Sequence, residues 1–174
     1  MTDLLLNEVG ALYDIYNNTN GPQWTLSPNS NVWNFADPRP CVPGSEWHGL
    51  TCYCIPSLYC VVVSIDLSFT NLHGRIPTTI GTFSNLRQLD LEANQLHHTI
   101  PSEIGSLLLL EHCSLYDNHI TGTIPSELGQ LLSLRFLTLG GSFDGSNFGD
   151  LNLNFNVEAS LMSGCPPIWV SLRI

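Results

Sequence analysis

Apolar and polar residues alternate at a fixed spacing through the middle of the chain. Three stretches carry the same pattern, beginning at Ile65, Leu89 and Cys113, so the period is 24 residues. In each stretch an L-x-L phrase alternates apolar and polar residues, which is the pattern of a β-strand with one buried face. One coil of this kind cannot bury its own apolar face, so the period predicts coils that stack into a solenoid.

The full phrase, L-x-x-L-x-L-x-x-N-x-L-x-G-x-I-P-x-x-I/L-G-x-L, is the pattern of leucine-rich repeats. It predicts an α/β solenoid, a right-handed superhelix with a parallel sheet on its concave face. Asn94 and Asn118 stand at the turn, where a buried amide can bond the backbone of its own coil and of neighbouring coils. On the convex side, prolines should fix the backbone and glycines should permit a tight turn at the end of a short helical segment. These residues are Pro77, Pro101, Pro125, Gly81, Gly105 and Gly129.

The repeats divide the chain into three parts. Residues 1–61 are expected to form an N-terminal cap, and residues 62–133 the three regular repeats. Residues 134–174 are expected to form a degenerate fourth repeat with an insertion of about 17 residues relative to the period. The last part ends in an apolar run at 168–170, which makes a poor polar cap. Either this run packs against another molecule, or the chain is a fragment of a longer array.

The cap is expected to be a helix, an aromatic plug and a hairpin. Residues 2–17 have helical spacing, with Thr2 as the N-cap. The face predicted to be buried comprises Leu5, Val9, Leu12 and Tyr16. Tryptophan and phenylalanine side chains should then cover the open end of the core, and a hairpin with its turn at 55–58 leads into the first repeat.

Charge narrows the classes of partner. The chain has 174 residues, of which five are basic and fifteen acidic, for a net charge of −10. That balance argues against binding nucleic acid or an anionic membrane through charge, and it is compatible with a basic partner. No apolar run is long enough to span a membrane. If the protein is secreted, its leader peptide is absent from this sequence.

Six cysteines are many for a cytosolic chain of this length. We expect disulfides between Cys41 and Cys52, which flank the end of the cap, and between Cys54 and Cys60, which face each other across the predicted hairpin. Disulfides imply an oxidising compartment. Four cysteines allow three pairings, and a zinc site is a competing interpretation, although the paired C-x2-C spacing is missing. Cys113 and Cys165 occupy core positions of the repeat.

These residues resemble a known family. The phrase NLHGRIPTTIGTFSNLRQLDLEANQL is similar to plant-type, extracellular leucine-rich repeats, the class of receptor-like kinase ectodomains and polygalacturonase-inhibiting proteins. The segment Ala11–Cys52 is similar to the N-terminal cap of those proteins, in wording close to algal and protist versions. The resemblance implies a secreted protein or one on the extracellular face of a membrane, which recognises proteins, peptides or glycans. Plant members usually carry many more repeats.

The outward positions of the repeat strands should line the concave face and form the ligand-binding surface. Carboxylates lie in neighbouring strands, and aromatic rings lie further along, which is typical of binding anchors. The binding residues predicted are Asp66, Gln88, Asp90, Glu92, His112, Ser114, Tyr116 and Phe136, with Ser64, Ser68 and Thr138 beside them. An ordinary solvated sheet face is the alternative. Asn17 begins a single glycosylation sequon.

No catalytic residue, cofactor or metal ligand is predicted. Paired carboxylates serve glycan-active enzymes, but a solenoid offers no deep pocket. A metal site is disfavoured because adjacent side chains of an extended chain point in different directions; the histidines concerned are His97, His98, His112 and His119. The convex threonines are too few for an ice-binding array.

The sequence therefore favours a non-catalytic recognition module that binds a protein, peptide or glycan through its concave face. The alternative is a scaffold subunit that docks on a larger complex through its apolar C-terminal end.

Overall fold

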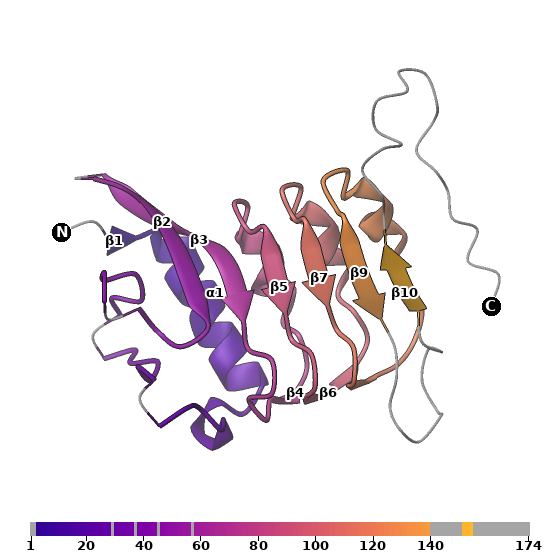
Figure 1. The fold of residues 1–174 in the computed structure, drawn as a ribbon, viewed down its shortest axis with the longest axis horizontal. Helices are drawn as coiled ribbons and strands as arrows, with labels where there is room; N and C mark the ends of the chain where they lie inside the picture. The colour runs from indigo at the N-terminus through magenta and orange to yellow at the C-terminus, as the bar shows by residue number, and fades with distance from the viewer. Residues whose placement is uncertain are drawn as a thin grey trace.

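The computed structural model describes residues 3–28, 30–36, 38–44, 46–56, 58–139 and 151–154. These residues form an elongated stack of coils with the cap at one end (Figure 1). One sheet runs along the stack in the order β1-β3-β5-β7-β9-β10, and β2 pairs with β3. Its strands are β1 Asp3–Leu4, β2 Leu50–Ile55, β3 Tyr59–Asp66, β5 Gln88–Asp90, β7 His112–Ser114, β9 Phe136–Leu139 and β10 Leu151–Asn154. Cys165 and the apolar run at 168–170 lie outside the described residues.

The repeat strands pair in parallel and in register. Ile65 lies beside Leu89, Leu89 beside Cys113, and Cys113 beside Leu137, and all four side chains are buried. Equivalent positions of successive repeats therefore form columns across the sheet, as the 24-residue period predicts. β10 pairs antiparallel with β9, so the parallel order ends at the fourth repeat strand.

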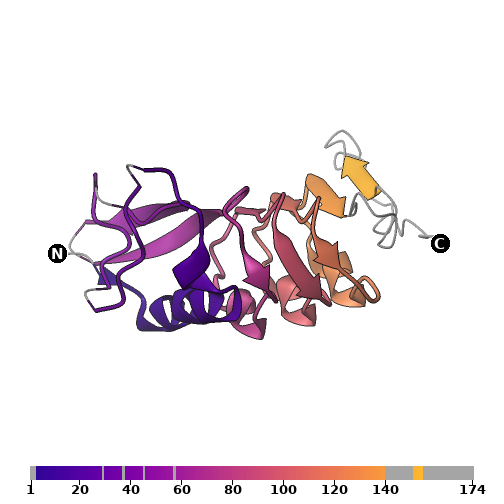
Figure 2. The same ribbon diagram turned by 90° about the horizontal axis from the view of Figure 1, so that it is seen from below.

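The convex side is built from 3-10 helices, which lie on one side of the sheet in Figure 2. They are η2 Thr78–Thr82, η3 Ser102–Ser106 and η4 Ser126–Gln130, and each begins directly after its repeat proline. The repeat glycines lie in the last turn of these helices and have no positive φ, so they do not act through a left-handed turn conformation. Instead they let the coils approach closely. A Cβ on Gly105 would lie 2.5 Å from the carbonyl oxygen of Glu127 in the next coil.

Each regular coil contributes a second short strand after its concave strand, and these strands form a smaller sheet. Its parallel strands are β4 His73–Gly74, β6 Gln95–His98 and β8 His119–Ile120, in the order β4-β6-β8. The sequence pattern did not predict it, because only two to four residues of each coil take part.

The turn asparagines join neighbouring coils. The Nδ2 of Asn94 donates to the carbonyl of Leu67 in the preceding coil at 2.8 Å, and its Oδ1 accepts from the N–H of Leu72 at 2.9 Å. Asn118 repeats this arrangement one coil further on, with Leu91 at 2.8 Å and Leu96 at 2.9 Å. The predicted role of the asparagines is therefore confirmed.

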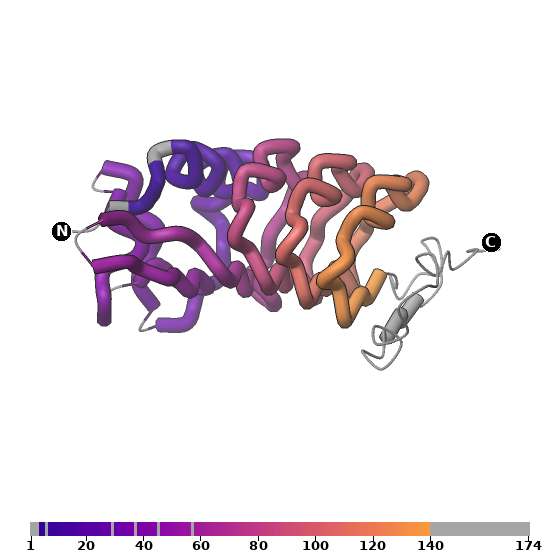
Figure 3. Tube along the Cα trace, turned by 90° about the horizontal axis from the view of Figure 1, so that it is seen from above, coloured from indigo at the N-terminus to yellow at the C-terminus, as the bar shows by residue number. Residues whose placement is uncertain are grey.

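The cap begins with α1 (Leu6–Asn18), which lies in line with the convex helices (Figure 3). Thr2 lies outside the described residues, and Leu5 occupies the N-cap without a side-chain bond. The predicted buried face is correct in part: Leu12 is buried, Val9 and Tyr16 are half-buried and pack against the core, and Leu5 is exposed. Glu8, Ala11 and Ile15 are buried as well, so the centre of the face is displaced. The face is displaced because Tyr16 turns toward the aromatic rings of the cap, 5.3 Å from Trp24 between centroids.

Aromatic rings and two disulfides hold the rest of the cap. The rings of Trp24 and Trp33 lie 4.9 Å apart, after the short 3-10 helix η1 (Gly21–Gln23). The structure contains disulfides between Cys41 and Cys52 and between Cys54 and Cys60, the pairs expected from the sequence.

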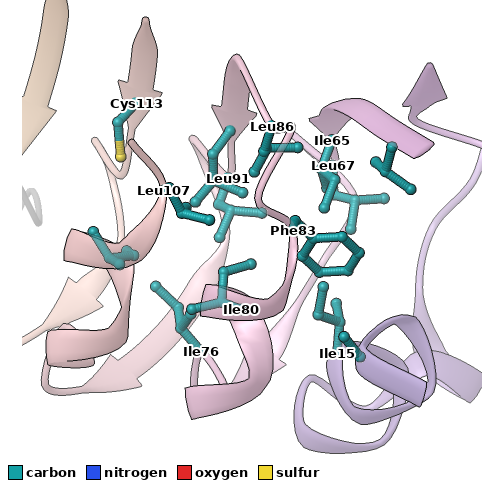
Figure 4. Packing of buried hydrophobic residues seen from close by; sticks show 14 of the residues in the cluster. Ile15, Ile65, Leu67, Ile76, Ile80, Phe83, Leu86, Leu91, Leu107 and Cys113 are labelled. Atoms are coloured by element: carbon teal, nitrogen blue, oxygen red, sulfur yellow. The ribbon is translucent and has the colours of Figure 1, made fainter. Parts of the chain in front are cut away.

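The core lies between the sheet and the convex helices (Figure 4). Ile65 and Leu67 of the first coil pack with Phe83, which follows η2, and with Ile15 of α1. Each fully buried side chain of this size contributes about 1.5–3 kcal/mol. The packing makes the sheet a stiff platform for the residues on its outer face.

Candidate functional site

Strand register gathers the predicted binding residues into columns on the concave face. Residues that lie side by side on neighbouring strands form columns across the sheet. The strand pairing defines two columns, and a third lies two residues beyond the second in each coil. They are Ser64–Gln88–His112–Phe136, Asp66–Asp90–Ser114–Thr138, and Ser68–Glu92–Tyr116. All eight predicted residues therefore lie on the same face of the sheet.

Three carboxylates form a row across this surface. Asp66 accepts hydrogen bonds from the hydroxyl of Ser68 at 2.7 Å and from its N–H at 3.2 Å, and Asp90 accepts from the N–H of Glu92 at 3.1 Å. Partial burial raises the pKa of Asp90; the hydrogen bond from Glu92 opposes this, and the charges of Asp66 and Glu92 add to it. Among the described residues no ion pair joins these three carboxylates to a basic side chain. The row thus holds negative charge that a cationic ligand could neutralise.

Ser114 is not an exposed ligand contact, contrary to prediction, because it is only 2% exposed. Its hydroxyl donates to Oε2 of Glu92 at 3.1 Å and accepts from the hydroxyl of Thr138 at 2.7 Å. A small side chain in the middle of the sheet lies below its larger neighbours. Ser114 therefore orients Glu92 from the floor of the surface.

Aromatic side chains stand at the other end of the face. Tyr116 is 38% exposed and Phe136 is 46% exposed. The rings of His112 and Phe136 lie 5.6 Å apart between centroids. Exposed rings fixed on adjacent strands can serve as apolar anchors for a partner.

Charged residues of opposite sign lie next to one another just before the concave strands β5, β7 and β9. Glu111 lies 2.6 Å from Arg87 and 3.7 Å from Arg135, each measured between a carboxylate oxygen and a guanidinium nitrogen. Glu111 is therefore neutralised within the protein, in contrast to the carboxylate row.

An open depression of about 450 Å³ lies where the concave sheet meets the cap. Its walls include His48 and Thr51 from the cap and Asp66 and Gln88 from the repeats. The Nδ1 of His48 lies 2.9 Å from the hydroxyl of Ser30. The depression was not predicted from the sequence, although the predicted hairpin already placed β2 beside β3.

Gly49 makes the depression possible. It has φ +74°, and a Cβ at this position would lie 2.1 Å from the carbonyl oxygen of Asp66. The N–H of Asp66 donates to the carbonyl of Gly49 at 2.7 Å. Only glycine allows this approach, which sets the cap against the first repeat strand.

The remaining candidates lie elsewhere. Asn17 is exposed in the last turn of α1, whereas Thr19 of its sequon is buried and donates its hydroxyl proton to the carbonyl of Ile15 at 2.7 Å. His112 lies on the concave sheet, whereas His97 and His98 lie on the second sheet. Within the part of the chain that the structure describes, no three His, Cys, Asp or Glu side chains are arranged to hold a metal ion, and no helix could cross a membrane.

Sequence comparison finds the same repeats in other proteins. The model of the Leucine Rich Repeat family matches residues 85–107 and 109–131. A probable leucine-rich repeat receptor-like protein kinase of Arabidopsis thaliana is 37% identical over 84 residues, which is 45% of this chain and 8% of that protein. The chain thus spans a small part of the length of this relative.

Solved structures show the same architecture. The BIR2 ectodomain of Arabidopsis thaliana matches with a TM-score of 0.62 and 25% identity, over 77% of this chain and 66% of that chain. The ectodomain of the Arabidopsis thaliana receptor kinase GASSHO1/SCHENGEN3, solved in complex with CASPARIAN STRIP INTEGRITY FACTOR 2, matches with a TM-score of 0.59 and 29% identity. That match covers 75% of this chain and 14% of the ectodomain.

Proposed function

Because the chain is a leucine-rich-repeat protein of the plant type, we propose that it is a non-catalytic recognition module whose concave face binds an extended peptide or protein segment. The observation that carries the proposal is the row of Asp66, Asp90 and Glu92, which has no cationic partner among the described residues and lies beside exposed aromatic rings. The GASSHO1/SCHENGEN3 ectodomain was solved with a bound factor.

The geometry defines what such a ligand must carry. A lysine or arginine over Asp66 and Asp90 would form charge-assisted hydrogen bonds, which are stronger than neutral ones. An aromatic or large aliphatic side chain would pack on Tyr116 and Phe136. Strands are spaced about 4.8 Å apart, so β3 to β9 span roughly 14 Å, the length of about four extended residues. The ligand is therefore a short segment with a cationic residue near one end and an apolar residue near the other.

The two disulfides favour an oxidising compartment, so the proposed location is extracellular. The negative charge of the face also makes binding dependent on salt, because exposed charges are screened within about 10 Å at 0.1 M ionic strength.

A peptide array tests the proposal. The probes are seven-residue peptides in which arginine and tryptophan are placed at varied separations, with matched peptides that carry glutamate in place of arginine. We expect binding to the first set only, strongest when about two or three residues separate arginine from tryptophan. Asp90→Asn should then weaken binding by about tenfold, the usual loss for a charge-assisted bond.

The matched control is Glu127→Gln, which removes one negative charge from the convex helix η4. It should leave binding unchanged. Tyr116→Ala should weaken binding, whereas Tyr53→Ala, which removes an exposed ring of β2, should not. Equal effects of Asp90→Asn and Glu127→Gln would contradict a concave site, and so would binding of the glutamate peptides.

The scaffold alternative rests on the apolar run at 168–170, which is not among the described residues. It stays a prediction: Trp169→Ala should disrupt association with a larger complex, as measured by size-exclusion chromatography. Association that survives this substitution would contradict it.

A further inference from the structure

Four of the six histidines gather on the second sheet. His73 and His97 hold the same position in successive repeats, and their ring centroids lie 5.3 Å apart. His119 lies opposite His97 in the pairing of β8 with β6. His98 follows His97 directly, so His97 is the centre of the group.

His97 and His98 face each other, although adjacent residues of a strand are expected to point apart. Their ring centroids lie 4.4 Å apart, and their Nδ1 atoms are in contact. The prediction from the sequence fails because His98 has φ +73°, a left-handed backbone that brings its side chain back toward His97. The two ring nitrogens thus converge, and a metal ion beside them could take both as neighbouring donors.

Backbone hydrogen bonds hold the histidine group both to the cap and to the next coil. The N–H of His73 donates to the carbonyl of Thr19 in the cap at 3.1 Å, and the N–H of Thr121 donates to the carbonyl of His98 at 2.8 Å. The rings themselves are largely accessible, since His73, His98 and His119 are exposed and His97 is half-buried.

The surroundings favour the neutral form of the His97 ring. The pKa of His97 is lowered chiefly by partial loss of hydration. Electrostatic repulsion from His98, His73 and His119 lowers it further. The nearest cationic residue along the chain is Arg75, whose guanidinium donates to Asn18 at 3.1 Å. No carboxylate in the described residues forms an ion pair with these rings. Neutral imidazole is the form that binds metal ions.

We propose that His97 and His98 form a surface site for a divalent transition-metal ion, with His73 and His119 beside it as further imidazole donors. No three described side chains surround one point as they stand, so the site begins as two imidazoles with water completing the coordination. Imidazole suits Cu²⁺, Ni²⁺ and Zn²⁺, and Cu²⁺ is bound most tightly in the general order of divalent ions. Protons compete for the same nitrogens, so copper affinity should fall as the pH is lowered.

Copper binding tests the site directly. The untagged protein is titrated with CuCl₂ at pH 7.4 by calorimetry, and the complex is examined by electron paramagnetic resonance. We expect one Cu²⁺ per chain with hyperfine coupling to ring nitrogen. His97→Gln should weaken binding at least tenfold and remove part of that coupling, and His98→Gln should act in the same direction.

His112→Gln is the matched control, because it makes the same substitution on the concave sheet. It should leave copper affinity unchanged, and circular dichroism should show that all three variants are folded. The proposal is overturned if the wild type binds no Cu²⁺, if the bound ion shows no nitrogen coupling, or if His97→Gln binds as tightly as the wild type.

Discussion

Replacing Glu8 by glutamine should stabilise the protein above pH 7. Glu8 lies in the first turn of α1 and is only 1% exposed. Its Oε2 accepts a hydrogen bond from the N–H of Val62 at 2.9 Å, and its Oε1 has no hydrogen-bond partner among the described residues. Burial raises the pKa of Glu8 from 4.5 to about 7, and the bond from Val62 offsets only part of that rise.

The magnitude and the sign follow from this shift in pKa. At about 1.4 kcal/mol per pKa unit, the rise from 4.5 to about 7 corresponds to about 3–4 kcal/mol as an upper bound. Between the two pKa values the folded protein holds the proton and the unfolded chain has lost it. Unfolding therefore releases a proton, and the free energy of unfolding falls as the pH rises from 4.5 to about 7. Below this range the stabilising contribution is complete, and above it the contribution is lost.

Glutamine keeps an oxygen for the N–H of Val62 and never ionises. Urea unfolding, followed by tryptophan fluorescence with the disulfides intact, would give the free energy of unfolding of both proteins from pH 4.5 to 8.5. The advantage of the variant should grow across this range to at most about 3–4 kcal/mol. Glu127→Gln, at the convex surface, should show no such growth. A difference between Glu8→Gln and wild type that stays constant with pH would refute the reasoning.

Three further substitutions test the packing of the coils. Asn94→Ala leaves buried backbone groups of Leu67 and Leu72 without partners. Urea unfolding should therefore show a free energy of unfolding lower by about 2–4 kcal/mol. A decrease below about 1 kcal/mol would mean that water replaces the amide. Gly105→Ala should lower the melting temperature, because its Cβ would lie 2.5 Å from the backbone of the next coil. Gly129→Ala is the control and should leave the melting temperature unchanged, since no described atom lies within 4 Å of its Cβ. Equal shifts in the two variants would contradict the argument from close approach. Changing Cys41 and Cys52 together to serine should cost about 2–3 kcal/mol of unfolding free energy, and an unchanged stability would contradict a role of this bond in holding the cap.

Periodic features of the fold could be predicted from the sequence, because each coil meets a near copy of itself. The spacing from Leu89 to Cys113 fixes which residues share a column, and the role of Asn94 follows from its place at a buried turn. The same logic placed Asp66 and Asp90 on one face. It did not predict the burial of Ser114, which depends on the sizes of the side chains around it.

Features that depend on a single backbone angle or on two sets of contacts were not predictable. His98 turns toward His97 because of one left-handed φ, which no repeat pattern records. The buried face of α1 was displaced because its side chains must serve both the core and the aromatic rings of the cap. Glu8 was overlooked for the same reason, since a carboxylate is not expected on the buried side of a helix. The depression beside Gly49 arises from the junction of two unlike parts, where no period applies.

The turn asparagines also give the stack a mechanical direction. Asn94 belongs to the second coil, yet its amide holds Leu67 and Leu72 of the first, and Asn118 reaches back in the same way. A molecule stretched by its two ends should therefore lose its coils one by one, starting from the side farthest from the cap. Each event would lengthen the chain by one period of 24 residues, or about 80 Å when extended. The force trace would be a series of small, evenly spaced steps, and the cross-linked cap would yield last.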